Sequence, residues 1–140
     1  MTRVRGFAMV SAIFILVVLA ALGGFIVSIS SGQQVGAALD LQGVRAYQAA
    51  RAGLEWGLYR QLRAGSCAGA TSFAPTASSL AGFTVTVECV ATADPGGFSG
   101  PTVHTVTATA CSQPNVAEPR CPNIANPGDL YVERRLSVSF

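Results

Sequence analysis

The chain contains few charged residues and no lysine. Only 11% of its 140 residues are charged, and all nine basic residues are arginines. Arg3 and Arg5 precede Gly6, and the seven arginines beyond this point are balanced by seven acidic residues. A basic patch that could follow a phosphate backbone is therefore missing, so we expect no nucleic-acid partner.

Catalytic and metal-binding motifs are also missing. The segment 97–100 lacks the Gly-x-Ser-x-Gly form of a nucleophile elbow, and no phosphate-cradling glycine loop occurs. No two cysteines form a CxxC pair, and the single His104 is not near a cysteine in the sequence. Zinc sites usually have more closely spaced ligands. We therefore expect neither an enzyme nor a metal or cofactor site.

The longest apolar run covers residues 7–29, which are 23 residues without a charge. As a helix this run would be about 35 Å long, enough to cross a bilayer core of about 30 Å. The arginines before it favour a cytoplasmic N-terminus, which places the remaining chain in the periplasm. The run predicts a single-pass protein of the bacterial inner membrane, whose body of about 110 residues supports one modest core.

Residues 30–64 continue the helix with an amphipathic pattern. Apolar residues recur mostly at intervals of three, four or seven, and no proline occurs before residue 75. The apolar positions of this stripe are Val35, Leu39, Val44, Tyr47, Leu54, Leu58 and Leu62. The pair Gly23-Gly24 is the favoured position for a bend, and Gly65 is the expected end of the helix.

The remaining residues, 65–140, predict a β-sheet. Apolar and polar residues alternate over 83–89, over 104–110 and again between 132 and 140, which is typical of half-buried antiparallel strands. A turn cluster at 94–101 separates the first two strands, and a proline-rich loop at 114–128 precedes the third. We therefore expect an α+β fold, in which a three-stranded antiparallel meander packs on the second half of a long N-terminal helix.

All four cysteines follow the apolar run, which suggests disulfides in an oxidising compartment. Four cysteines allow three connectivities. Cys89 shares a strand face with Val85 and Val87, toward the helix, and Cys67 comes just after the helix. Cys111 falls on the opposite, threonine-bearing face, where Cys121 could reach it. The alternation favours Cys67–Cys89 and Cys111–Cys121. The rival pair Cys89–Cys111 requires a bulge that turns one strand over.

The N-terminal border does not fit an ordinary signal peptide. The apolar run exceeds the usual 7–15 residues, no Ala-x-Ala site follows it, and no cysteine follows it as in a lipoprotein signal. A plain signal anchor fits the length but gives Gly6 no role. Cleavage between Gly6 and Phe7 would remove a leader of residues 1–6 and leave the helix attached to the mature chain. This layout is that of a type IV prepilin.

Three segments carry a resemblance to the MshP family, minor pilin-like proteins of the mannose-sensitive haemagglutinin (MSHA) type IV pilus. They read RGFAMVSAIF, ALDLQGVRAYQAARAGLEWGLYRQL and YVERRLSVSF. The resemblance covers essentially the whole chain and implies a type IV pilin-like fold. It also implies cleavage at Gly6–Phe7 by a prepilin peptidase, followed by N-methylation. Its implied partners are major and minor pilins and an inner-membrane assembly platform, and its implied final location is the extracellular pilus.

Ser11 departs from the pattern of most type IV pilins, which resemble one another in carrying a glutamate at the fifth mature position. That carboxylate is thought to offset the amine of a neighbouring subunit. A buried charge without a partner costs several kcal/mol, whereas a hydroxyl contributes about 1 kcal/mol. Ser11 therefore indicates a low-copy subunit near the pilus tip. Two alternatives remain open: a minor pseudopilin of type II secretion, and a signal-anchored periplasmic binding domain unrelated to pili.

The leader interpretation predicts that Gly6 is essential for processing. A β-branched side chain at this position should block a peptidase that requires a small residue at the membrane border. We expect Gly6→Val to leave full-length precursor in the membrane, whereas the parent chain starts at Phe7. Mass spectrometry of the mature N-terminus checks this, and a Gly6→Val protein that still starts at Phe7 would refute it.

Overall fold

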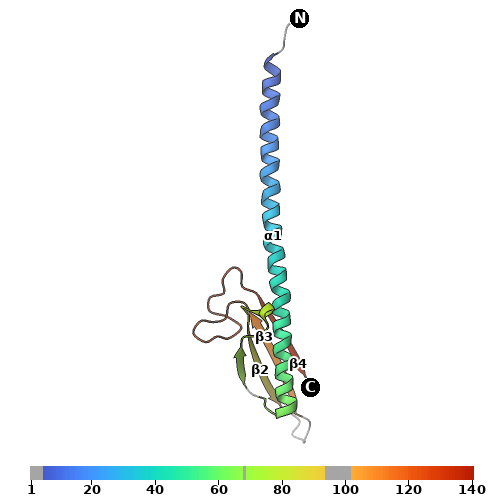
Figure 1. Ribbon diagram of the computed structural model, residues 1–140, viewed down its shortest axis with the longest axis vertical. Helices are drawn as coiled ribbons and strands as arrows, with labels where there is room; N and C mark the ends of the chain where they lie inside the picture. Colours follow the sequence, from blue (N-terminus) through green and yellow to red (C-terminus); the bar gives the residue numbers. More distant parts are fainter. Residues whose placement is uncertain (1–4, 68, 94–101) are drawn as a thin grey trace. The chain divides into compact units, whose positions relative to one another are not determined.

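The computed structural model describes residues 5–67, 69–93 and 102–140, with side chains from Met9 onward. Helix α1 (Arg5–Ala64) comes first, and β1 (Ala70–Phe73) and the short 3-10 helix η1 (Ser78–Leu80) follow (Figure 1). The chain continues through β2 (Thr84–Thr92), β3 (Val103–Cys111) and β4 (Glu133–Ser139). It divides into two compact units, Met1–Ala38 and Leu39–Phe140, which are described separately below.

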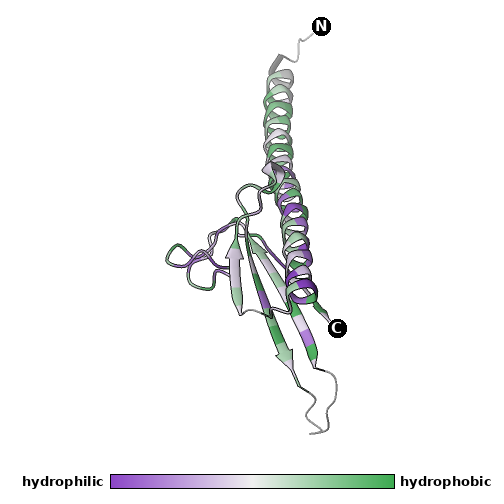
Figure 2. Cartoon of the chain, turned by 60° about the horizontal axis from the view of Figure 1, so that its bottom comes forward, coloured by the Kyte–Doolittle hydropathy of each residue, from purple (hydrophilic) through white to green (hydrophobic). Residues whose placement is uncertain are grey.

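The first unit consists of the N-terminal part of α1. Its helical structure continues without a break through Gly23 and Gly24, where the sequence favoured a bend. Large apolar side chains are exposed on every side of it, including Phe14 (68% exposed) and Phe25 (65%). In Figure 2 the N-terminal part of the helix is coloured mostly green, as hydrophobic residues are. The prediction of a long apolar N-terminal helix is confirmed.

The C-terminal end of α1 lies where the sequence predicted it. Gly65 has φ = 61°, a left-handed conformation that favours glycine. Its N–H donates to the carbonyl oxygen of Gln61 at 3.0 Å, and the N–H of Ser66 donates to that of Arg60 at 3.4 Å. These bonds satisfy two of the carbonyl groups that a helix end leaves without partners, and they turn the chain toward the sheet.

The second unit contains a four-stranded sheet, not the three-stranded sheet that the sequence predicted. The strands follow in the order β1-β2-β3-β4, and every neighbouring pair is antiparallel. The prediction missed β1, which pairs Phe73 with Val85 and packs Phe73 on Trp56 with ring centroids 5.2 Å apart. The residues Ala-Thr-Ser-Phe do not alternate between apolar and polar, so this strand has no periodic signal in the sequence.

The other strands lie close to their predicted positions, and each boundary moves by a few residues. The predicted loop at 114–128, described throughout, contains no helix and no strand. The predicted turn at 94–101 lies outside the described residues. The α+β class and the meander order of consecutive strands are confirmed, with β1 as the additional first strand.

The core of the second unit forms where α1 crosses the sheet (Figure 1). Ala46, Ala49 and Ala50 are fully buried against an apolar layer of β2 and β3. The residues of this layer are Val85, Val87, Val106, Ala108 and Ala110. Gly53 and Gly57 extend the helix face. A Cβ at Gly57 would lie 2.7 Å from Val106 Cγ1 and 2.8 Å from Val87 Cγ1, closer than atoms pack. The helix backbone therefore lies directly on the valine side chains.

This close approach explains why the predicted apolar stripe was wrong. Val44, Tyr47 and Leu62 are 59%, 44% and 68% exposed, while Leu39 and Leu54 only flank the core. A leucine or tyrosine on the contact face would hold the helix away from the sheet, because its side chain would occupy the space that the valines fill. The small residues face the sheet, and several large ones point away from it.

The contact predicts different effects for two glycine substitutions. Gly57→Ala should destabilise the fold, because overpacking costs about 1–3 kcal/mol. The higher helix propensity of alanine offsets about 1 kcal/mol of this loss. Gly43→Ala is the matched control, because the atoms that its Cβ would approach are those at the far end of the long Arg134 side chain, the nearest at 3.0 Å. We expect it to be neutral or stabilising. Denaturant unfolding of the full chain in detergent, followed by circular dichroism, checks both. Equal stabilisation by the two variants would rule out a tight contact.

Candidate functional site

The predicted processing residues lie at the start of α1. Gly6 and Phe7 belong to its first turns, and the Phe7 side chain is outside the described part of the chain. Ser11 lies one turn further on and is partly exposed. The cleavage site and the role of Ser11 remain predictions.

The N-terminal part of α1 is the strongest candidate for a membrane segment. Among the described residues, this is the one helix long and apolar enough to cross a bilayer. None of its most apolar segment is buried, and a helix that is apolar all round requires lipid or other apolar helices around it. Each Å² removed from water would contribute about 25 cal/mol. The helix is therefore a candidate membrane anchor.

The C-terminal part of α1 presents a second uncovered surface, which we call the outer face. It contains Leu41, Val44, Tyr59 and Leu62, which are 53–68% exposed. At 100° per residue these positions lie on the side of the helix opposite Ala46 and the two contact glycines. Polar residues separate the two apolar pairs, so the outer face is mixed in character, unlike the N-terminal part of the helix.

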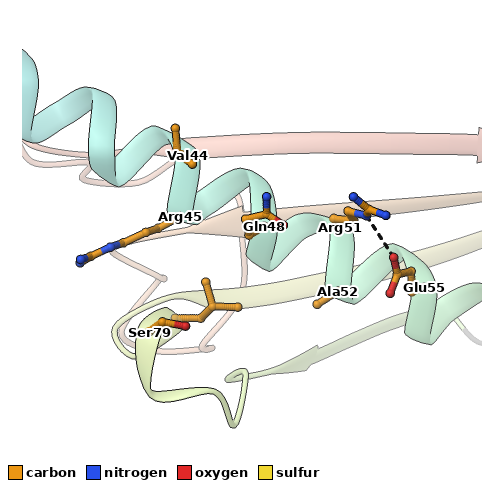
Figure 3. Close-up of a pocket in the computed structure, with 8 residues that line it drawn as sticks. Val44, Arg45, Gln48, Arg51, Ala52, Glu55 and Ser79 are labelled. Carbon is orange, nitrogen blue, oxygen red and sulfur yellow. Dashed lines mark hydrogen bonds and ion pairs between the residues drawn. The ribbon is translucent and has the colours of Figure 1, made fainter.

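An open groove of about 560 Å³ borders the outer face (Figure 3). Its lining residues come from α1 and η1: Val44, Arg45, Gln48, Arg51, Ala52, Glu55, Ser79 and Leu80. Arg51 Nε lies 3.1 Å from Glu55 Oε1, and both side chains are largely exposed. Such a pair contributes only about 0.3–0.5 kcal/mol. In Figure 3, Arg45 points away from this pair. The polar side chains that line the groove do not point toward one shared position. The groove is therefore better suited to contact with a protein surface than to binding a small molecule.

Two disulfides connect the cysteines in the pairs that side-chain alternation favoured. Cys67 and Cys89 have Cα atoms 5.1 Å apart, and those of Cys111 and Cys121 are 5.7 Å apart. The strand register excludes the rival pair, because Cys89 lies opposite Val106 whereas Cys111 lies opposite Thr84. Cys111 therefore lies five residues along β3 from Val106, the residue opposite Cys89.

The second disulfide attaches the proline-rich loop to the sheet face that points away from α1. The backbone N–H of Cys121 donates to Thr86 Oγ1 at 2.8 Å. Cys111 and Thr86 are almost completely buried there. The loop therefore covers part of the threonine-bearing face, and the Thr86 hydroxyl provides an acceptor for the loop backbone.

A tyrosine further along stabilises the return of the loop to β4. The Tyr131 hydroxyl donates to Glu133 Oε2 at 2.6 Å and accepts from the N–H of Asn123 at 3.1 Å. Burial raises the pKa of the Tyr131 phenol above its ordinary value, and the hydrogen bond to Glu133 raises that pKa further. The phenol therefore stays protonated and keeps its hydrogen bond across the physiological pH range.

The structure brings His104 to the first disulfide, which the sequence did not predict. One ring nitrogen of His104 and the sulfurs of Cys67 and Cys89 lie within 4.8 Å of one another. His104 is two residues before Val106, the partner of Cys89, so His104 and Cys89 are diagonal neighbours on one sheet face. The residues are far apart in the sequence. Only the hairpin register, combined with the Cys67–Cys89 pairing, could have revealed the cluster.

No protein-family model, curated protein or solved structure matches this chain significantly. Its function is therefore argued from its own residues and their geometry.

The anchoring of the loop predicts the effect of removing one buried acceptor. Thr86→Val leaves the N–H of Cys121 without its acceptor and the Ser72 hydroxyl without its partner, which should lower the free energy of unfolding by about 1–3 kcal/mol. Thr109→Val is the matched control, because within the described part of the chain the Thr109 hydroxyl accepts from Arg135 Nε, and the Arg135 side chain is 57% exposed. Water can replace that bond, so we expect a loss of about 0.5 kcal/mol or less. Equal losses in denaturant unfolding would contradict this role of Thr86.

Proposed function

We propose that this chain is a minor pilin of the MSHA type, similar to the MshP family, that helps to start assembly of a type IV pilus. The observation that carries the proposal is the double character of α1. Its N-terminal part leaves every large apolar side chain from Met9 to Ile29 uncovered, while its C-terminal part forms the core of a small disulfide-bonded domain. A pilin-like subunit requires this combination.

The apolar part of the helix would have two successive environments. Before assembly it spans the inner membrane, with the arginine-bearing N-terminus in the cytoplasm and the domain in the oxidising periplasm, where its disulfides form. Prepilin peptidase cuts between Gly6 and Phe7, and the new amine is methylated. The inner-membrane assembly platform then transfers the helix from lipid to a bundle of pilin helices, which again excludes water from the same apolar side chains.

The outer face of α1 would contact neighbouring subunits. Val44 belongs both to this face and to the groove, so apolar contact surface and hydrogen-bonding side chains lie next to each other. Interfaces of this mixed composition are typical of subunits that first exist separately and associate later. This surface supports contacts with other major and minor pilins.

Ser11 supports a position at low copy near the tip. In a repeating shaft, each buried N-terminal amine needs a compensating carboxylate, since a buried unpaired charge costs several kcal/mol. A serine hydroxyl provides only a neutral hydrogen bond, worth about 1 kcal/mol. A subunit at the filament end can lack the carboxylate, because no neighbouring amine lies against its helix.

The proposal predicts that charge at position 11 controls incorporation. Ser11→Glu should raise the amount of this protein along purified shafts, whereas Ser11→Gln, equal in size but uncharged, should not. Deletion of the gene should sharply reduce pilus number, while wild-type shafts contain only traces of the protein. Quantitative mass spectrometry of shafts and pilus counts measure these outcomes.

Three results would decide against the proposal. Abundant wild-type protein along the shaft would exclude the tip position, and equal incorporation of the Gln and Glu variants would exclude the electrostatic argument. Normal piliation together with lost protein secretion after gene deletion would favour the pseudopilin alternative.

A further inference from the structure

The Cys67–Cys89 disulfide and His104 form a cluster that the proposed assembly role does not use. We propose that the reduced form of this cluster binds one zinc ion through the thiolates of Cys67 and Cys89 and the imidazole of His104. The disulfide and the zinc site are then two alternative states of the same residues. Among the described residues, this is the one group of three or more potential metal ligands within such a distance.

The positions of the three ligands suit a tetrahedral ion. With Zn–S of about 2.3 Å and Zn–N of about 2.1 Å, neighbouring ligand atoms lie about 3.6–3.8 Å apart. The three atoms already lie within 4.8 Å of one another. After reduction the sulfurs must separate to this spacing. Cys67 lies between α1 and β1, outside any helix or strand, so it can move while the strands hold Cys89 and His104.

His104 is held in place but lacks a hydrogen-bond partner at one nitrogen. Two backbone hydrogen bonds join it to Phe140, at 2.9 and 3.1 Å, and the two rings lie 5.9 Å apart. Its Nδ1 is buried and has no partner among the described residues. Buried polar atoms nearly always have a partner, so an exception requires an explanation. The ring therefore has a nitrogen that is open to a further interaction, such as one with a metal ion.

The chemistry is complete once a reductant is named. A dithiol transfers two electrons and two protons to the disulfide, so that the S–S bond breaks, two thiols form and the dithiol becomes a cyclic disulfide. Zinc binding then releases the two thiol protons, while neutral His104 donates a nitrogen lone pair. Water completes the tetrahedron, as in other zinc sites with three protein ligands. Thiolates and imidazole together favour zinc over magnesium or calcium.

The other disulfide lacks these features. Cys111 and Cys121 are only 0% and 3% exposed, and the backbone N–H of Cys121 is bonded to Thr86. By contrast, Cys67, Cys89 and His104 are all partly exposed, so reductant and metal can reach them. The chain therefore provides its own comparison between a convertible disulfide and a structural one.

The test uses the full chain in detergent, reduced with a phosphine and then titrated with Zn²⁺ alone without oxygen. Native mass spectrometry should find one zinc per reduced chain and none per oxidised chain. His104→Asn should weaken zinc binding by about tenfold or more, as measured by competition with a chromophoric chelator, and Cys67→Ser should abolish it. The double variant Cys111→Ser, Cys121→Ser is the control and should bind zinc as the parent chain does.

A second measurement does not depend on the folding of any variant. In the reduced parent chain, zinc should protect Cys67 and Cys89 from alkylation, while Cys111 and Cys121 react at the same rate with and without zinc. The proposal is overturned if the reduced parent binds no zinc, if His104→Asn binds it equally tightly, or if zinc protects Cys111 and Cys121 instead.

Discussion

The second unit depends on one close contact, that of the α1 backbone with the valine layer of the sheet. Alanines and glycines on one helix face let the backbone approach, and the contact buries Val85, Val87 and Val106 almost completely. Dispersion attraction falls quickly with distance, so close approach compensates for the small size of the helix side chains. It also leaves several large side chains of α1 for the outer face.

The opposite sheet face is completed by different means. The loop after β3 contributes few apolar side chains, and it is attached by the Cys111–Cys121 disulfide and by the Thr86 acceptor. A loop without helix or strand loses much conformational entropy on ordering, and a disulfide lowers that loss by restricting the unfolded chain. The small domain therefore has a packed side facing α1 and a covalently secured side facing away from it.

The sequence predicted features that depend on local pattern or on simple geometry. Gly65 as the end of α1, three of the strands and the agreement of both disulfides with side-chain alternation belong to this group. The sequence-based predictions failed where tertiary contacts determine which residues are buried or lie side by side. The predicted apolar stripe, from Val35 to Leu62, has helical spacing. The sheet nevertheless packs against the helix face that has the smallest side chains. His104 lies beside the Cys67–Cys89 disulfide because of the register between β2 and β3. A sequence pattern does not specify this register. The roles of Gly6, Phe7 and Ser11 concern other molecules and remain predictions.

The two parts of the continuous helix α1 are stabilised in different ways. Apolar surroundings would stabilise the hydrogen bonds of its N-terminal part, and the sheet stabilises the part beyond Leu39. Residues 30–38 have neither. A Cβ added at Gly32 or Gly36 would meet nothing within 4 Å, and the Ser31 hydroxyl donates back to the Ser28 carbonyl oxygen, where it competes with the helix ladder. This segment should therefore exchange its amide hydrogens faster than the helix interior on either side of it.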